Sequence, residues 1–274
     1  MKYGFVLPFG DARTAAELAH IAESEGWDGF FMWEAIWGID PWVGLAAAAM
    51  RTERIRLGTM LTPLPIRKPW KLASETATLD NLSGGRLILS VGLGAAHDTG
   101  FAHFGEETDR KIRAEKLDEG LAILTGLWGG QPFAFEGKHY RLEPTDFMLP
   151  PAPVQQPRIP IWVVGAYPRR KSMQRALRYD GLLPMFLDEE GKMLQPTPGQ
   201  MRQLCGDVRQ QPGSDQPYDV VWEGMTSGAD RGAAAAAVQP WIDAGITWWI
   251  EANWETRDPN AVVERIRQGP PVER

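Results

Sequence analysis

Short apolar segments alternate with helical patterns along nearly the whole chain, and this alternation constrains the fold more than any other feature. Eight segments are apolar runs, rich in β-branched and aromatic residues and ended by turn residues, as is typical of buried strands. These segments are KYGFVLP, DGFFMW, RIRLGTML, RLILSVG, PIWVVG, DGLLPMF, YDVVWEG and GITWWIEAN. A helical pattern follows each of them. Because alternating strands and helices imply parallel strands, eight such units in about 250 residues predict an α/β fold of the closed (β/α)8, or TIM-barrel, type. An open doubly wound sheet is the competing arrangement.

The longest helical pattern lies in the middle of the chain and is followed by a break. Apolar side chains spaced four, three and four residues apart from Leu117 to Trp128 form one stripe, which predicts a helix over residues 106–128. The segment 129–157 then interrupts the alternation, since FAFEGKHYRL predicts a small hairpin and LPPAPVQQP an extended run. We therefore expect one domain over residues 1–274, with this segment as an insertion after the fourth strand–helix unit.

Composition favours a small-molecule partner. The formal net charge is −6, which disfavours nucleic acid or an anionic membrane surface. The one cysteine, Cys205, cannot form an intramolecular disulfide. No apolar run reaches the roughly 18 residues of a membrane-spanning helix, and the N-terminal apolar run, which ends at Pro8, is too short for a signal peptide. We expect a cytoplasmic protein with no nucleic-acid or membrane partner.

The active site of such a barrel lies at the carboxyl ends of its strands, which we call the mouth. The residues that this rule selects are Pro8, Phe9, Trp33, Glu34, Trp37, Thr59, Met60, Thr62, Gly92, Gly94, His97, Gly165, Ala166, Tyr167, Pro168, Glu223, Gly224, Glu251, Asn253 and Trp254. The chain has 12 tryptophans, and those near strand ends could line a site for a flat ligand. Packing in the core and loops is the alternative role for each of these rings.

Two residues of the mouth could move a proton. Glu34 ends an apolar strand among aromatic residues, where a carboxylate can bind a ligand or act as an acid or base. Pairing with a nearby backbone amide is its alternative role. His97 lies in the loop after the fourth strand and, with His103, could face the same site. We take Glu34 and His97 as the candidate catalytic residues.

A glycine turn and two arginines favour a ligand that carries a phosphate group. The stretch LSGGRLILSVGLG ends in Gly92 and Gly94, which allow a ligand to approach the backbone closely. It is only superficially similar to a G-x-G-x-x-G dinucleotide fingerprint, because the sixth position is His97. In VGAYPRRK, Arg169 and Arg170 open a predicted helix and favour an anion. Their alternative role is that of solvated surface residues.

No motif of the chain supplies redox or nucleophilic chemistry by itself. The metal-binding spacings H-x-H, H-E-x-x-H and C-x-x-C are absent from the sequence, and so is the G-x-S-x-G nucleophile elbow. We therefore predict no dedicated metal site. We expect a cofactor to do the chemistry while the barrel binds and orients it.

Three stretches resemble the bacterial luciferase-like flavin-dependent oxidoreductases. They are RIRLGTMLTPLPIRKPWKLASETATLDNLSGGRLILSVGLG, RAEKLDEGLAILTGLWGGQPFAFEGKHYRL and PAPVQQPRIPIWVVGA. The similarity runs from the first strand to about residue 266. The resemblance implies a (β/α)8 barrel that binds FMN, or alternatively the deazaflavin F420, at its mouth.

The resemblance also implies which residues bind the cofactor. A non-proline cis peptide bond behind the flavin ring maps to Thr59–Met60 or one bond away. The glycine turn after the fourth strand passes near the cofactor, and the end of the fifth strand contacts its ring system and phosphate. The candidate cofactor-binding residues are Thr59, Met60, Gly92, Gly94, Gly165, Ala166, Tyr167, Pro168, Arg169 and Arg170.

Two departures from the family pattern bear on mechanism. Many relatives have an acidic residue followed by histidine after the second strand, whereas this chain has Glu34 followed by Ala35, so a proton supplied by that histidine does not carry over. The luciferases proper hold phosphate with an arginine in the turn after the fourth strand, where this chain has Leu93, Gly94 and Ala95. That turn is nearer to the F420-type and general oxidoreductase members, so light emission is not predicted.

The first function that we expect is a two-component monooxygenase. Reduced FMN from a separate flavin reductase would react with O2 and oxygenate a small organic substrate. The alternative is an F420-dependent dehydrogenase or reductase that transfers hydride without O2. A flavin-binding protein without turnover is a second alternative, because the usual histidine is absent. Relatives are often dimers, so a homodimer is expected by analogy alone.

Overall fold

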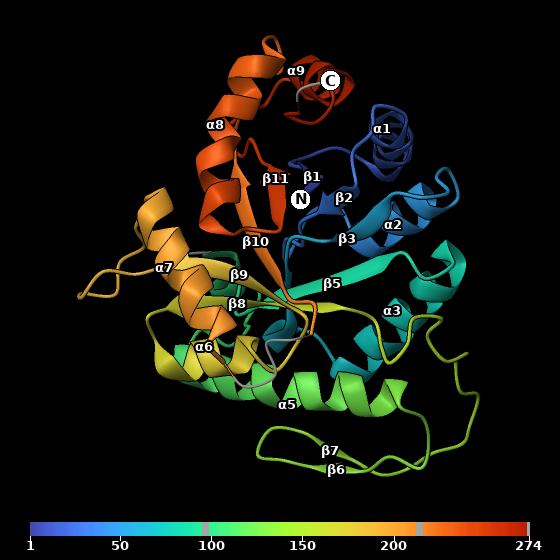
Figure 1. Cartoon of the computed structure of the whole chain (residues 1–274). Coiled ribbons are helices and arrows are strands. Elements are labelled where there is room, and N and C mark those ends of the chain that lie inside the picture. Colours follow the sequence, from blue (N-terminus) through green and yellow to red (C-terminus); the bar gives the residue numbers. More distant parts are fainter. Residues whose placement is uncertain (95–98, 212–215, 273–274) are drawn as a thin grey trace.

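The strands close into a barrel, as the alternation predicts. The computed structural model describes residues 1–94, 99–211 and 216–272. Eight parallel strands follow one another in the order β3, β2, β1, β11, β10, β9, β8 and β5, and β5 pairs with β3 to close the ring (Figure 1). Their bounds are β1 Lys2–Leu7, β2 Gly29–Met32, β3 Arg56–Thr59, β5 Leu87–Gly92, β8 Ile161–Tyr167, β9 Gly181–Phe186, β10 Asp219–Gly224 and β11 Trp248–Glu251. The closed ring excludes the open doubly wound sheet.

Helices connect successive strands and surround the barrel (Figure 1). They are α1 Ala12–Ser24, α2 Pro41–Ala49, α3 Pro69–Ser83, α4 Thr99–His103, α5 Arg110–Trp128, α6 Arg170–Ala176, α7 Pro198–Arg209, α8 Arg231–Ala244 and α9 Pro259–Arg267, and a short strand β4 Thr62–Pro63 and a 3-10 turn η1 Leu64–Ile66 precede α3. The helix predicted over residues 106–128 begins later, at Arg110. The reason is a cap, because the Ile112 amide donates a hydrogen bond of 2.9 Å to Asp109 Oδ1.

Aromatic rings fill the interior of the barrel. Phe31 lies 5.5 Å from Trp162 and 6.0 Å from Trp248, centroid to centroid, and the two tryptophans are 5.2 Å apart. Glycine makes room for Phe31, because a Cβ on Gly29 would lie 2.6 Å from its ring. The interior is therefore a packed core, and a ligand can bind only at an end of the barrel.

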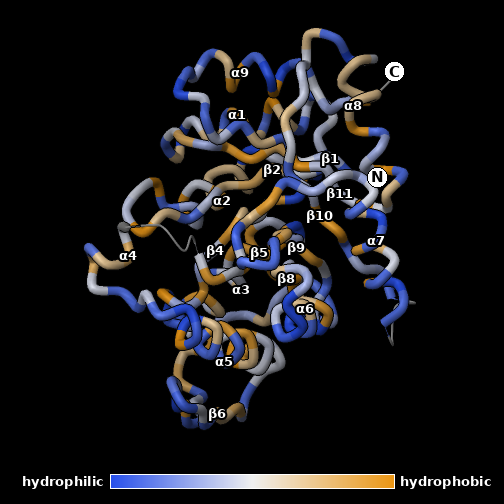
Figure 2. The backbone as a smooth tube through the Cα atoms, turned by 90° about the vertical axis from the view of Figure 1, so that its left-hand side faces the viewer, coloured by the Kyte–Doolittle hydropathy of each residue, from blue (hydrophilic) through white to orange (hydrophobic). Residues whose placement is uncertain are grey.

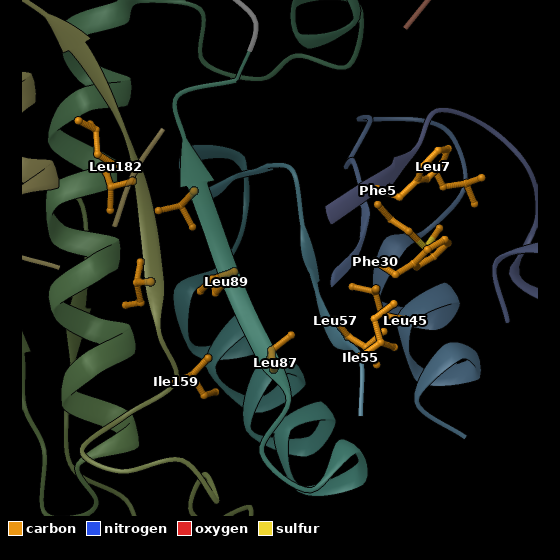
Figure 3. Close-up of a cluster of buried hydrophobic side chains, with 14 of the residues drawn as sticks. Phe5, Leu7, Phe30, Leu45, Ile55, Leu57, Leu87, Leu89, Ile159 and Leu182 are labelled. Carbon is orange, nitrogen blue, oxygen red and sulfur yellow. The ribbon is translucent and has the colours of Figure 1, made fainter. Parts of the chain in front are cut away.

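A larger apolar cluster lies between the strands and the helices, and Figure 3 shows part of it. Leu87 and Leu89 of β5 belong to this outer cluster, whereas Ile88 between them belongs to the interior. Successive side chains of a strand point to opposite faces. The same alternation decides which side chains at the strand ends face the mouth.

Arg86, which opens β5, holds the amino end of the barrel together. Its side chain is 9% exposed, and α3 ends just before it because Gly84 adopts left-handed backbone at φ 67°. The guanidinium donates hydrogen bonds to four backbone carbonyl oxygens, those of Ala49, Thr52, Ile55 and Ser83. The glycines and the arginine at the start of LSGGRLILSVGLG are therefore structural and lie at the end opposite the mouth.

A two-stranded hairpin occupies the segment between α5 and β8. β6 Phe135–Glu136 and β7 Arg141–Leu142 pair antiparallel, as FAFEGKHYRL predicts. The hairpin lies outside the barrel next to α5 (Figure 1), and Glu119 of that helix accepts hydrogen bonds from three of its backbone amides. That residues 129–157 form an insertion stays an interpretation.

Hydrophilic stretches of the chain lie mostly on outer helices such as α6 and α9 (Figure 2). Among the helices that the structure describes, none combines the length and the apolar character that crossing a membrane requires.

Candidate active site

Two walls of different chemistry face each other across the mouth. In the ring of eight strands, β10 lies four places from β3 in either direction, so the ends of these two strands are opposite. On one side, Gly92 of β5 and Ala166 of β8 lie beside Met60 and Leu61, which follow β3. On the other, Glu223 of β10 bonds to Trp254, which follows β11, and Trp254 meets Trp33, which follows β2 next to β3. We call the first the glycine wall (Met60, Leu61, Gly92, Ala166) and the second the tryptophan wall (Trp33, Glu223, Trp254).

Gly92 lies in the glycine wall where neighbouring side chains leave no room for one of its own. A Cβ on Gly92 would lie 2.9 Å from Val164 Cγ2 and 3.1 Å from Leu61 Cδ2. Ala166, on the neighbouring strand β8, is small and buried. Below Gly92 on the same face of β5, Ser90 Oγ is buried and has no hydrogen-bond partner in the described part of the chain. The space at Gly92 is therefore filled by the apolar side chains of Val164 and Leu61, and the unsatisfied Ser90 hydroxyl lies on the same face of β5.

The peptide bond that follows β3 is cis, between Met60 and Leu61. It lies one bond along from Thr59–Met60, within the range that the resemblance implies. Thr59 is fully buried and faces away from the interior, since its Oγ1 donates a 3.2 Å hydrogen bond to the Ser90 carbonyl and accepts one of 3.1 Å from Thr62. Thr59 therefore supports the wall from behind and does not present its side chain to a ligand.

The end of β8 divides between two faces. Ala166 faces the mouth, whereas a Cβ on Gly165 would overlap side chains beneath α6. Tyr167 also points outward, and its hydroxyl donates a 2.8 Å hydrogen bond to Asp207 of α7. Burial, followed by the bond to Asp207, raises the pKa of Tyr167 to about 12. Gly165 and Tyr167 can therefore meet a ligand only through their backbone, and a cis bond joins Tyr167 to Pro168 before α6 begins.

Three cations follow at the rim of the mouth. The side chains of Arg169, Arg170 and Lys171 are exposed. In the described ranges, none of the three forms an ion pair with a carboxylate, unlike Arg175 in the same helix, which binds Asp118 at 2.6 Å. Their charges are therefore free to meet an anion.

Arg113 of α5 was not among the predicted site residues, and it holds the glycine turn after β5. It is 3% exposed and donates hydrogen bonds to the Leu93 carbonyl at 3.0 Å and the Gly94 carbonyl at 2.9 Å. Its guanidinium also lies 5.0 Å from the centroid of the Phe101 ring. One signal could have found it, since Arg113 stands four residues before Leu117 on the apolar stripe of the helix. A charge on such a stripe is buried, and a buried charge needs partners.

Glu34 lies in a buried ion-pair network. Its side chain is 7% exposed, and its Oε1 lies 3.1 Å from Arg67, which also pairs with Glu75 of α3. Burial raises the pKa of Glu34, and this effect outweighs the opposite effect of Arg67. Its Oε2 is buried with no hydrogen-bond partner among the described residues. The carboxyl is thus paired with a cation and not with a backbone amide. Its role in proton transfer stays a prediction.

We expect replacement of Arg67 by methionine to lower the free energy of unfolding by about 2–3 kcal/mol at neutral pH, because it leaves a buried carboxylate uncompensated. The loss should shrink in acid. Burial already raises the pKa of Glu34 above its ordinary 4.5, and removal of Arg67 raises it further, so below 4.5 the carboxyl is protonated both folded and unfolded. Urea unfolding across pH measures this.

The matched control is Arg51→Met, which breaks an ion pair with Glu17 whose side chains are 50% and 56% exposed. Exposed pairs contribute little, so this variant should stay within about 0.5 kcal/mol of the parent. A loss for Arg67→Met that is equally small, or that does not change with pH, would contradict the buried network.

The tryptophan wall is held together by hydrogen bonds between its members. Glu223 lies on the same face of β10 as Val221 of the interior cluster, so its carboxyl faces the mouth. Trp254 Nε1 donates a hydrogen bond of 2.9 Å to Glu223 Oε2. Trp254 meets Trp33 edge to face at 6.2 Å, and Trp33 Nε1 donates a 2.7 Å hydrogen bond to the Pro8 carbonyl.

The remaining candidates do not add a reactive group. His97 lies outside the described residues, and His103 is exposed on α4. Over residues 1–94, 99–211 and 216–272, no three His, Cys, Asp or Glu side chains gather in a way that could hold a metal ion. Cys205 is buried in α7, and burial raises its pKa to about 11, which disfavours the reactive thiolate.

The closed ring of eight parallel strands, with a cis bond after β3 and a glycine at the end of β5, defines the class of protein, a TIM barrel. The chain belongs to the luciferase-like monooxygenase family, whose model matches residues 1–250.

The chain is similar to a curated protein and to solved structures whose names describe different reactions. A Mycobacterium tuberculosis protein whose name describes a coenzyme F420-dependent oxidoreductase is 32% identical over 198 residues, which are 68% of this chain and 56% of that protein. Among solved structures, monooxygenase RslO1 from Streptomyces bottropensis has a TM-score of 0.76 at 21% identity, covering 98% of this chain and 97% of that one. Coenzyme F420-dependent tetrahydromethanopterin reductase from Methanopyrus kandleri has a TM-score of 0.72 at 18% identity, covering 98% of both chains. The match to the Mycobacterium tuberculosis protein spans little more than half of that protein's length.

Proposed function

We propose that this protein is an F420-dependent oxidoreductase that transfers a hydride to or from a small organic substrate. The observation that carries the proposal is the turn after β5. Leu93 and Gly94 place no cation there for a phosphate, and Arg113 is committed to their carbonyl oxygens from behind. The F420 dependence in the names of the mycobacterial and methanogen relatives supports the same choice.

The residues of the mouth fit a deazaflavin. A flat ring system needs a surface without projecting side chains, which Gly92 and Ala166 favour because both are small, and the buried Ser90 hydroxyl lacks a partner in the described part of the chain. A phosphate on the cofactor's tail needs free cations at the rim, and Arg169 and Arg170 are exposed. When bound, F420 supplies a hydride acceptor or donor.

The protein's own contribution is binding, orientation and exclusion of water. Gly92 and Ala166 would hold the ring at the mouth, beside the Met60–Leu61 backbone. Trp33 and Trp254 are more than a third exposed, so they would exclude water once a substrate lies against them. Glu34 and His97 stay the predicted groups for proton transfer.

The test of this proposal is turnover under strict anaerobiosis. The purified protein is incubated with oxidised F420 and a panel of small alcohols, and with reduced F420 and the matching carbonyl compounds, while absorbance follows the cofactor's redox state. The proposal expects at least one compound to change that state without O2. Turnover that occurs only with reduced FMN and O2 would contradict it.

We expect the double substitution Arg169→Ala/Arg170→Ala to weaken F420 binding about tenfold, or ~1.4 kcal/mol, because it removes two charges from the phosphate. The difference in F420 affinity between the parent and the double variant should be smaller at high salt, since exposed charges are screened. Fluorescence titration measures both effects. Arg178→Ala, at the other end of α6, is the matched control and should bind as the parent does. An unchanged affinity of the double variant for F420 would contradict the proposal that Arg169 and Arg170 bind the phosphate.

The second candidate is the two-component FMN monooxygenase, which the likeness to monooxygenase RslO1 favours. It requires a separate flavin reductase as a partner and O2 as a co-substrate. Consumption of O2 with reduced FMN and a substrate distinguishes it from hydride transfer. The flavin-binding alternative predicts that the cofactor binds, but that neither hydride transfer nor O2 consumption follows. The homodimer and the cytoplasmic location stay predictions.

A further inference from the structure

Glu223 is a carboxyl group placed where the barrel's interior meets the mouth. Along β10, Asp219 accepts a 3.2 Å hydrogen bond from the interior ring of Trp162, and Val221 belongs to the interior cluster. Trp222 points the other way, since it stacks on Trp241 of α8 at 5.3 Å. By this alternation Glu223 is the last interior-facing side chain of the strand.

The bonding of this carboxyl is incomplete. Its Oε2 accepts the indole hydrogen of Trp254, while no donor reaches its Oε1 in the described part of the chain. In that part, no Lys, Arg or His lies within ion-pair distance of either oxygen. Burial raises the pKa of Glu223, and the hydrogen bond from Trp254 opposes this only in part. Glu223 Oε1 is not one of the buried polar atoms that lack a partner, so water reaches it and a ligand hydroxyl can replace that water.

The place of Glu223 indicates which partner. The ends of β10 and β3 are opposite in the ring, so a flat cofactor against the glycine wall has its free face toward Glu223. Trp33 and Trp254 stand beside the carboxyl at right angles to each other, and both are more than a third exposed. Exposed indoles give an apolar surface for a ring, and the carboxyl gives one directional contact.

We propose that Glu223 recognises the substrate, with its Oε1 hydrogen-bonding a hydroxyl group on a ring compound that lies against Trp33 and Trp254. This inference rests on the proposed function, because it takes the glycine wall as the cofactor's side. A hydroxyl matches the site because Oε1 can accept its hydrogen while Oε2 keeps the bond from Trp254, and the two indoles beside the carboxyl offer an apolar surface without further acceptors for an ammonium group.

The experiment compares two ring probes of similar shape, para-fluorophenol and para-difluorobenzene, which differ by one hydroxyl. Both are titrated into the F420-loaded protein and into the protein without cofactor, and fluorine NMR relaxation reports their affinities. We expect the parent to bind the phenol about fivefold more tightly than the difluoro compound. Glu223→Leu should bring the ratio of the two affinities close to one. Glu223→Gln should keep most of the preference for the phenol, because an amide also donates and accepts hydrogen bonds.

Controls separate recognition from folding. Glu255→Leu removes an exposed carboxyl beside Trp254 and should leave the ratio unchanged. If leucine prevents folding, as judged by circular dichroism, Glu223→Ala removes the carboxyl without adding bulk. A parent ratio near one, failure of both probes to bind, or a ratio that survives in Glu223→Leu or Glu223→Ala overturns the inference. F420 affinity, measured separately, should stay within about twofold in all variants, and its absence in the parent would overturn the proposed function instead.

Discussion

Replacement of Gly92 by valine is expected to weaken cofactor binding at least 100-fold, or about 2.7 kcal/mol. The physical reason is space. A Cβ at this position already lies 2.9 Å from Val164 and 3.1 Å from Leu61, so the added methyl groups crowd these side chains and displace the surface on which the flat ring is expected to lie. Cofactor fluorescence titration of the parent and the variant measures the change.

Two further variants make this result specific. Gly206→Val lies in α7, where nothing is within 4 Å of an added Cβ, and should bind cofactor like the parent. Gly92→Ala should give an intermediate loss, and its smaller side chain keeps the test available if valine lowers the unfolding temperature strongly. Binding by Gly92→Val that equals the parent's would mean that the ring does not lie on the glycine wall.

Arg86→Met should have the largest effect on stability, a loss of about 4 kcal/mol in the free energy of unfolding. Methionine fills much of the same volume but cannot donate, so four buried carbonyl oxygens at the amino end of the barrel lose their donor. Burial lowers the pKa of Arg86, whereas its hydrogen bonds to the four carbonyl oxygens favour the charged guanidinium. Urea unfolding followed by circular dichroism measures the loss.

The matched control for Arg86 is Arg54→Met, an exposed arginine two residues before β3. Such surface substitutions usually stay within about 0.5 kcal/mol. A loss below about 1 kcal/mol for Arg86→Met would show that water replaces the lost bonds and that this end of the barrel is open.

The barrel could be predicted from the chain because its signal is local and repeated. Each strand is a short apolar run, each helix has its own stripe or cap, and the end of α3 at Gly84 needs only a residue that tolerates φ 67°. The start of α5 lies later than the apolar stripe predicts. The apolar stripe marks the face of a helix, whereas the Asp109 cap that begins it is a single polar residue among several.

The mouth could be predicted only in part. The rule for strand ends selects Gly92, Ala166 and Glu223, because strand positions alone decide it. It cannot distinguish side chains that face the mouth from those that face a helix, which is why Thr59 and Tyr167 were selected with the rest. Partners far apart in the chain are also invisible to it: Glu34 meets Arg67, and Glu223 meets Trp254, only when the ring closes.

The glycine turn that ends LSGGRLILSVGLG illustrates the same limit. Gly92 keeps the role that its place at a strand end suggests, a position where a side chain does not fit. Gly94 has a second reason to be glycine, since its φ is 81° and a Cβ would crowd the Phe101 ring. The arginine that holds this turn comes from α5, nineteen or twenty residues further along the chain.

Binding of F420 at the mouth is tested most directly by a paired titration of the purified protein with F420 and with FMN. Quenching of each cofactor's fluorescence gives the two dissociation constants. We predict saturable F420 binding in the micromolar range or tighter, near −8 kcal/mol, with FMN bound at least tenfold more weakly. Tight binding of FMN without binding of F420 would contradict the claim.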